Sequence, residues 1–170
     1  METIEEGLKI RGFFHLQIVE DQDDGTRKIV GDSGWIENLV TNLGFNNIVN
    51  QLGTSLTGSK ISHAALGTGG APSAADTTQA GEVSTNVSGS VVRAALTAAT
   101  SSSSKTLRNT ATFSSANSFL TASANISNVG LWQTSGPTTA SGTLMCGNTY
   151  TSSACATNQN VNLTYDLIFN

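Results

Sequence analysis

The sequence predicts an all-β protein: an antiparallel β-sandwich of about eight to ten short strands, with one short helix near residues 42–52. Two segments, Leu8–Val19 and Asn160–Phe169, alternate apolar and polar residues, which is typical of strands that are buried on one face. Clusters of Gly, Asn, Asp and Ser separate the other short apolar segments, as turns between strands do. A single segment repeats its apolar residues at the spacing of a helix.

The first two strands are expected to form a hairpin. The apolar residues of Leu8–Val19 mostly occupy even positions, and the segment is followed by Asp21–Thr26, whose Asp-Gly pair favours a tight turn. Arg27–Val30 then resumes as the partner strand. After a break that contains two glycines, Trp35–Val40 is short and apolar enough to form a further strand.

The helix is predicted because the spacing of the apolar residues changes after the expected strand Trp35–Val40. Its apolar residues recur at intervals of three and four: Phe45, Ile48, Val49 and Leu52. Thr41 or Asn42 is available as the N-cap, and Gly53 lies just past the last apolar residue, where helices often stop.

The rest of the chain is predicted to consist of strands and loops. The expected strands are Ile61–Leu66, Val91–Leu96, Leu107–Phe113, Gly142–Thr149 and Asn160–Phe169. A long loop follows the first of them and runs to about Ser88. Between Leu120 and Leu131 the parity of the apolar positions changes near Asn128, which indicates a β-bulge.

The chain is expected to form one domain, residues 1–170, with an N-terminal hairpin arm at about residues 1–31. Charged residues make up only 12% of the chain, and their distribution is uneven. Nine of the twelve acidic residues lie between Glu2 and Glu37, whereas Asp166 is the only charged residue after Arg108. A surface with so little charge favours oligomerisation over a solvated monomer.

Two contact regions follow from this asymmetry. The candidate docking arm carries the acidic residues Glu2, Glu5, Glu6, Asp21, Asp23 and Asp24. The candidate subunit-packing strand is the last one, which alternates strictly through Val161, Leu163, Tyr165, Leu167 and Phe169. We expect a homo-oligomer, with a trimer favoured.

The composition argues against several classes of function. The net charge is −4 and the basic residues are scattered, so the basic cluster that nucleic-acid binding requires is lacking. No run of about 18 apolar residues occurs, so no membrane span is predicted. Met1–Gly7 carries three Glu and lacks the basic and apolar regions of a secretory signal, so synthesis in the cytoplasm is expected.

No catalytic, cofactor or metal site is predicted, and the protein is not expected to be an enzyme. His15 and His63 have no acidic residue close in sequence, and no nucleophile-elbow motif accompanies them. Gly67–Gly70 lacks the following Lys of a phosphate-binding loop. The acidic run Asp21–Asp24 lacks a ligand at the fifth position of a calcium loop, so a solvated hairpin tip is favoured there.

The two cysteines leave two alternatives open. Cys146 and Cys155 could bond across a hairpin, or they could remain free buried thiols, which is the favoured interpretation.

The aromatic residues also leave two alternatives. A sugar-stacking platform could be built from Trp35, Trp132, Tyr150 and Tyr165, but core packing is the favoured role of the two Trp residues.

Several short motifs resemble those of small virion proteins of tailed bacteriophages. They are Glu37–Gly44, Ala65–Pro72, Asp76-Thr77, Glu82, Val129–Trp132 and Gly142–Met145, and together they span most of residues 35–170 in a matching order. The resemblance implies β-sandwich proteins that decorate heads or build tail and fibre parts through subunit contacts, and it supplies no catalytic residue. The long acidic hairpin before Gly31 departs from this pattern.

We therefore expect a bacteriophage virion structural protein, made in the host cytoplasm. The favoured role is a capsid decoration or minor capsid subunit that contacts the major capsid protein and other virion proteins. The alternative is a tail, collar or tail-fibre subunit, which could bind a glycan of the host surface. A carbohydrate-binding module outside any phage is a third possibility.

Overall fold

The computed structural model describes residues 9–53, 60–83, 93–101, 103–135 and 144–170. Within these ranges the elements are β1 (Ile10–Asp21), β2 (Arg27–Val40), α1 (Asn42–Gly53), β3 (His63–Gly67), β4 (Ala94–Ala95), β5 (Thr97–Ser101), β6 (Thr106–Phe113), the 3-10 turn η1 (Ser115–Asn117), β7 (Ala124–Trp132), β8 (Leu144–Cys155) and β9 (Asn160–Phe169). The prediction of an all-β protein with one short α-helix is confirmed.

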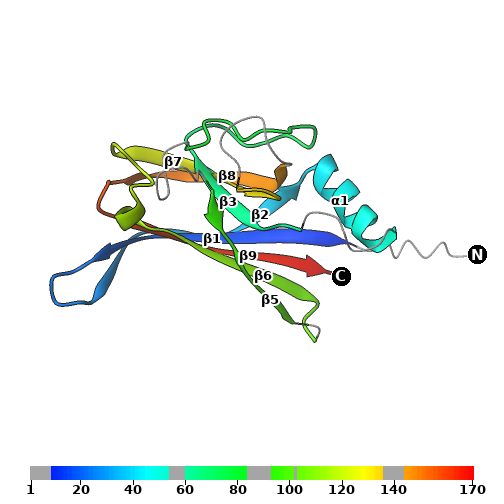
Figure 1. Cartoon of the computed structure of the whole chain (residues 1–170), viewed down its shortest axis with the longest axis horizontal. Coiled ribbons are helices and arrows are strands. Elements are labelled where there is room, and N and C mark those ends of the chain that lie inside the picture. The colour runs from blue at the N-terminus through cyan, green and yellow to red at the C-terminus, as the bar shows by residue number, and fades with distance from the viewer. Residues whose placement is uncertain (1–8, 54–59, 84–92, 102, 136–143) are drawn as a thin grey trace, which may run out of the picture.

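One antiparallel sheet contains all these strands, in the order β4-β3-β7-β8-β2-β1-β9-β6-β5. The sheet folds over into two layers, with β3, β7 and β8 in one and β1, β9, β6 and β5 in the other (Figure 1). β2 joins the layers, because it pairs with β1 and, through Leu39 and Val40, with β8. The two edge strands β4 and β5 are separated in the chain only by Leu96, so the sheet is nearly closed into a barrel.

The hydrophobic core lies between the two layers. Along β1 the side chains of Phe14, Leu16 and Ile18 are buried while Phe13, His15 and Gln17 are only half-buried, as the alternation in the sequence predicts. Complete burial of one such side chain stabilises the fold by roughly 1.5–3 kcal/mol. The predicted bulge near Asn128 is also present as a shift of register between β7 and β8.

The hairpin is longer than predicted, because the segments expected as two separate strands form the single strand β2. Two shifts of register interrupt the pairing with β1, one at Ser33 and Gly34 and one at Val30, and Gly34 adopts a positive φ of 65°. The hairpin tip projects beyond the body of the molecule (Figure 1), and every residue from Asp21 to Val30 is exposed.

The helix begins where expected, and Thr41 is its N-cap: the Gly44 N–H donates to Thr41 Oγ1 at 3.0 Å. The same hydroxyl donates to the Leu144 carbonyl at 2.6 Å, which fixes α1 against β8. A Cβ at Gly44 would overlap the Met145 carbonyl oxygen, so the close approach requires glycine there.

The inward face of the helix differs from the apolar pattern of the sequence. Phe45 and Val49 are 44% and 63% exposed, whereas Gly44, Ile48 and Gln51 face the body. The apolar spacing therefore predicted the helix correctly but not the side on which it packs.

A buried ion pair fixes the loop that covers the outer side of β3, β7 and β8. Arg93 donates from Nε and Nη2 to the two carboxylate oxygens of Glu82, at 2.7 and 3.1 Å, and both side chains are almost completely buried. The guanidinium carbon of Arg93 lies 3.4 Å from the centroid of the Trp132 ring. Gln79 adds a further link by accepting a hydrogen bond from the Trp132 indole at 3.2 Å.

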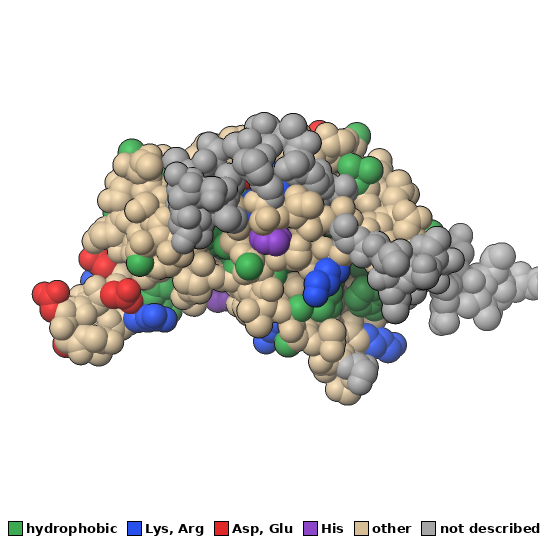
Figure 2. Space-filling model, viewed as in Figure 1, with side chains coloured by type: hydrophobic (Ala, Val, Ile, Leu, Met, Phe, Trp, Pro, Cys, Tyr) green, Lys and Arg blue, Asp and Glu red, His purple; other side chains and the backbone are tan. Residues whose placement is uncertain are grey.

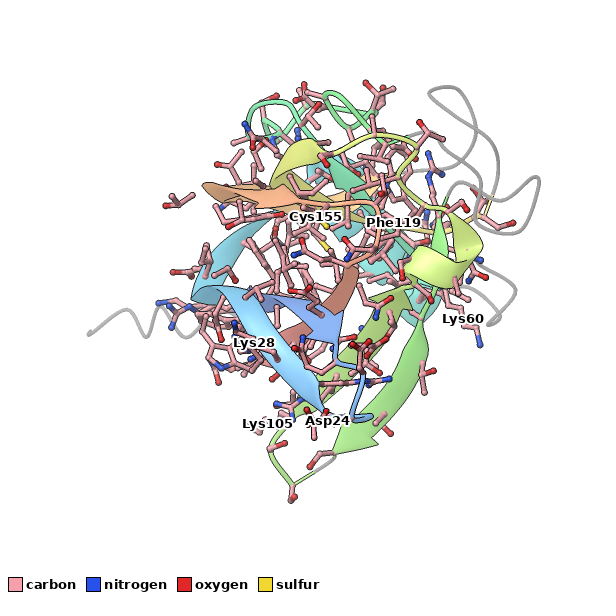
Figure 3. All side chains as sticks on the ribbon, turned by 90° about the vertical axis from the view of Figure 1, so that its left-hand side faces the viewer. Asp24, Lys28, Lys60, Lys105, Phe119 and Cys155 are labelled. Carbon is pink, nitrogen blue, oxygen red and sulfur yellow. The ribbon has the colours of Figure 1, made fainter. Side chains whose placement is uncertain are left out.

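Cys146 and Cys155 are free and buried, so the favoured alternative is confirmed. Both lie on β8 and do not face each other across a hairpin, and Figure 3 places Cys155 between the layers. Burial raises the pKa of the Cys146 thiol to about 12 and that of Cys155 to about 11.

Replacing Glu82 by Gln is expected to destabilise the protein by about 3–5 kcal/mol, because it leaves the buried Arg93 charge uncompensated. Denaturant titration would measure the loss. The matched control is Glu37→Gln, which removes the exposed ion pair with Arg11 and should cost less than about 1 kcal/mol. Equal losses in the two variants would contradict this account of the loop.

Both thiols are expected to resist alkylation in the folded protein. At pH 8 a thiol with a pKa near 11 is ionised in only about one molecule in a thousand, and burial also blocks the reagent. A thiol assay should detect almost no reaction under native conditions and both cysteines in denaturant. Rapid reaction of either thiol in the native protein would contradict the placement of β8.

Candidate functional site

The candidate site is a patch of aromatic and charged side chains on the outward face of β2, β1, β9 and β6. We call it the Trp35 face and define it by Phe13, His15, Trp35, Arg108, Asp166 and Ile168. Trp35 is 52% exposed, an unusual position for so large an aromatic side chain. A shallow hollow of about 450 Å³ lies beside it, bordered by these residues except His15.

Strand register assembles this face in two parallel rows. One row crosses the strands through Glu37, Phe13, Asp166 and Arg108, and the next runs through Trp35, His15, Thr164 and Thr110. Neighbouring strands lie about 4.8 Å apart, so side chains within each row touch. Residues far apart in the sequence thus form one continuous surface.

The Trp35 ring is positioned by two basic side chains. The centroids of the His15 and Trp35 rings are 5.4 Å apart, and the guanidinium carbon of Arg108 lies 6.0 Å from the Trp35 centroid. The second distance is at the outer limit of about 6 Å for a cation–π contact. Neither contact covers the ring completely, so part of it remains open to a partner.

Arg108 is held in place by Asp166 through two parallel hydrogen bonds. Its Nε and Nη2 atoms donate to Oδ1 and Oδ2 of the carboxylate at 2.8 and 2.7 Å. The hydrogen bond and charge of Asp166 raise the pKa of Arg108 above its ordinary value. The only acidic residue of the C-terminal region is therefore paired within the chain.

His15 has an acidic partner that its sequence neighbourhood did not reveal. Its Nε2 lies 2.6 Å from Asp32 Oδ1, because the hairpin brings together residues that are 17 positions apart. Hydrogen bonds from the Gln17 amide, the Gly34 N–H and His15 lower the pKa of Asp32 to about 2. Asp32 therefore remains ionised over the physiological range and orients the imidazole.

This His–Asp pair does not form a catalytic triad with the residues that surround it. The nearby Ser33 hydroxyl accepts from the Leu16 N–H at 2.9 Å and donates to the Gly34 carbonyl at 2.7 Å. It is thus engaged with the backbone of the hairpin, and no hydrogen bond joins it to His15 in the described part of the chain. Nor do three or more His, Cys, Asp or Glu side chains converge as metal ligands among the described residues.

The predicted docking residues lie at the tip of the β1–β2 hairpin, as far as they are described. Asp21, Asp23 and Asp24 are exposed there, and Figure 2 shows acidic and basic side chains together at this end of the molecule. Asp21 pairs with Arg27 at 3.1 Å, and Figure 3 shows Asp24 at the turn of the hairpin and Lys28 further along β2. The tip is therefore of mixed charge.

The other three predicted docking residues, Glu2, Glu5 and Glu6, lie outside the described residues. The docking role of the acidic residues stays a prediction.

The predicted subunit-packing side chains face the interior of the chain itself. Val161, Leu163, Tyr165 and Leu167 are at most 2% exposed, and Phe169 is half-buried. Their alternation identified the strand correctly, but the first four pack in the chain's own core. A subunit contact through β9 would have to use the outward residues Asn162, Thr164, Asp166 and Ile168.

Among the four aromatic residues considered for a sugar platform, Trp35 alone presents a largely exposed ring. Trp132 and Tyr165 are buried, and Tyr150 packs edge-on against Phe14 with the ring centroids 6.0 Å apart. The expectation of core packing is correct for Trp132 and wrong for Trp35. The sequence carried a weak signal that Trp35 is exposed. Trp35 and the charged Glu37 are two positions apart on β2, so their side chains lie on the same face of the strand.

No protein-family model, curated protein or solved structure matches the chain. The described helices include none that is long and apolar enough to cross a membrane.

Removing the side chain of Trp35 is expected to affect the stability of the protein much less than removing that of Trp132. Trp35→Ala should lower the free energy of unfolding by about 1–1.5 kcal/mol, because only about half of the side chain is buried. Trp132→Ala should cost about 3–5 kcal/mol, since it empties a buried site beneath Arg93. Thermal and denaturant unfolding of both variants would test this, and a large loss in the Trp35 variant would show that this ring is a core element.

Proposed function

We propose that this chain is a non-enzymatic structural subunit of a tailed-bacteriophage particle, a capsid decoration or minor capsid subunit that attaches to the shell through the Trp35 face. The observation that carries this proposal is the half-exposed Trp35 ring, held by His15 and Arg108 on a rigid sheet. The virion assignment draws on the order of the motifs between Glu37 and Met145, which resembles that of small phage structural proteins.

The chemistry of the face favours a protein partner. Trp and Arg are enriched among the residues that contribute most of the binding energy at protein interfaces. Phe13 and Ile168 add apolar surface beside the hollow, and the neighbouring row carries Thr164 of β9 and Thr110 of β6. The supporting strands are already ordered, so binding would lose little conformational entropy.

The charge of the face fits a contact made by many weakly bound copies. Each acidic residue of the two rows around Trp35 is paired with an arginine, Asp166 with Arg108 and Glu37 with Arg11. Covering paired charges costs less than covering isolated ones. A homo-oligomer, for which we favour a trimer, would multiply such modest contacts into firm attachment.

A second candidate function is a tail, collar or fibre subunit that binds a glycan of the host surface. The open Trp35 ring favours it, because an aromatic ring can stack on a sugar while neighbouring polar groups bind hydroxyls. Arg108 and Asp166 border the same hollow and offer such groups, although each already bonds to the other.

Trp35→Ala is expected to weaken attachment to the particle at least about tenfold, the loss typical of an interface residue that contributes 1.4 kcal/mol or more. Co-sedimentation of purified protein with tail-less capsids, and separately with isolated tails, of the phage that encodes it would measure this. The matched control is Phe45→Ala on α1, an aromatic residue of similar exposure (44%) outside the face.

The location of binding separates the two candidates. Attachment to tail-less capsids supports a decoration subunit, whereas attachment to tails alone, with glycan binding that requires Trp35, supports the second candidate. Binding to neither structure, or equal losses in the Trp35 and Phe45 variants, would overturn the proposed role of the face.

A further inference from the structure

An apolar pocket of about 530 Å³ is lined by residues of α1, β5, β6 and β9 and by Lys60 and Ile61. Figure 1 shows α1 and the C-terminal end of β9 at the same end of the molecule. Its apolar lining comes from five parts of the chain: Ile48, Ile61, Ala98, Leu107, and Leu167 with Phe169. The volume falls within the range of about 300–1,000 Å³ that is typical of small-molecule sites. The pocket is separate from the Trp35 face, because no residue lines both.

Two carboxamides with unmatched hydrogen-bonding atoms line this apolar pocket. Asn109 takes an inward position on β6 between Leu107 and Ala111, where the alternation calls for an apolar residue. It is completely buried, and neither its Oδ1 nor its Nδ2 has a hydrogen-bond partner in the described part of the chain. The Nε2 atom of Gln51 on the facing helix is buried without a partner as well.

Buried polar atoms are almost always hydrogen-bonded, because leaving them unpaired is unfavourable. Apolar residues at these positions would have avoided that cost. The polar neighbour Asn47 is different, since it accepts a hydrogen bond from Gln133 at 2.7 Å. Asn109 and Gln51 thus line the pocket with amide atoms that lack a partner in the described part of the chain.

We propose that this pocket binds a small neutral molecule with an apolar body and one group that both donates and accepts hydrogen bonds, as a carboxamide does. The apolar body packs against Leu107, Leu167 and Phe169, and the polar group pairs with the Asn109 side chain. A neutral ligand is favoured because the amides carry no charge, and the one charged residue among the described lining residues, Lys60, is exposed to solvent.

Three probes of nearly equal size test the proposal: hexanamide, 2-heptanone and hexanoate. In 2-heptanone a methyl group replaces the amide nitrogen of hexanamide, so this probe accepts but cannot donate. Hexanoate carries a negative charge. Titration of the full chain, followed by protein and ligand NMR, should show hexanamide binding at least about tenfold more tightly than either of the other probes.

Asn109→Leu keeps a side chain of similar size and removes the unmatched amide. In this variant the preference for hexanamide over 2-heptanone should disappear while 2-heptanone still binds. Gln51→Leu should reduce the same preference, and it serves as the second variant if Asn109→Leu does not fold. Phe45→Ala, on the outer face of the same helix, should leave all three affinities unchanged.

Failure of every probe to bind wild-type protein would overturn the proposal, since the amides would then be satisfied by water alone. Equal affinities for hexanamide and 2-heptanone, or tighter binding of hexanoate, would overturn the assigned ligand class. These measurements do not involve the particle or the Trp35 face, so their outcome is independent of the proposed attachment.

Discussion

The alternation of side chains along β1 and β9 is the constraint on which the rest of the structure depends. Phe14 and Leu16 point inward from β1, and Leu163 and Tyr165 point inward from β9, so the register between these strands is fixed by the core. The same alternation places the intervening residues on the opposite face. A slip of one residue would expose the core and bury the charged and aromatic side chains around Trp35.

The sequence predicted those features that depend on local pattern. The final strand, the hairpin turn, the helix start and the bulge near Asn128 are all confirmed, because each follows from periodicity or turn chemistry within a short segment. β5 was missed because its threonines and alanines are all exposed and show no alternation. The packing side of α1 was also missed, since it is decided by the close approach of Gly44 to β8.

The candidate site could not be predicted to the same extent, because its contacts join distant segments. Asp32 reaches His15 only when the hairpin closes, and Arg108 reaches Asp166 across 58 positions through the pairing of β6 and β9. Asn109 differs: its parity on β6 already placed it with the inward residues. A polar amide among the inward residues of β6 is a signal for the pocket, and this signal was already present in the sequence.

We propose that the protein joins a phage particle and that the Trp35 face is covered in this assembly. Hydroxyl-radical footprinting of the free protein and of assembled particles tests it directly, because Trp132, only 1% exposed, provides an internal reference. The account predicts strong oxidation of Trp35 in the free protein, protection of Trp35 in particles and little oxidation of Trp132 in either. Equal oxidation of Trp35 in free and assembled protein would contradict it.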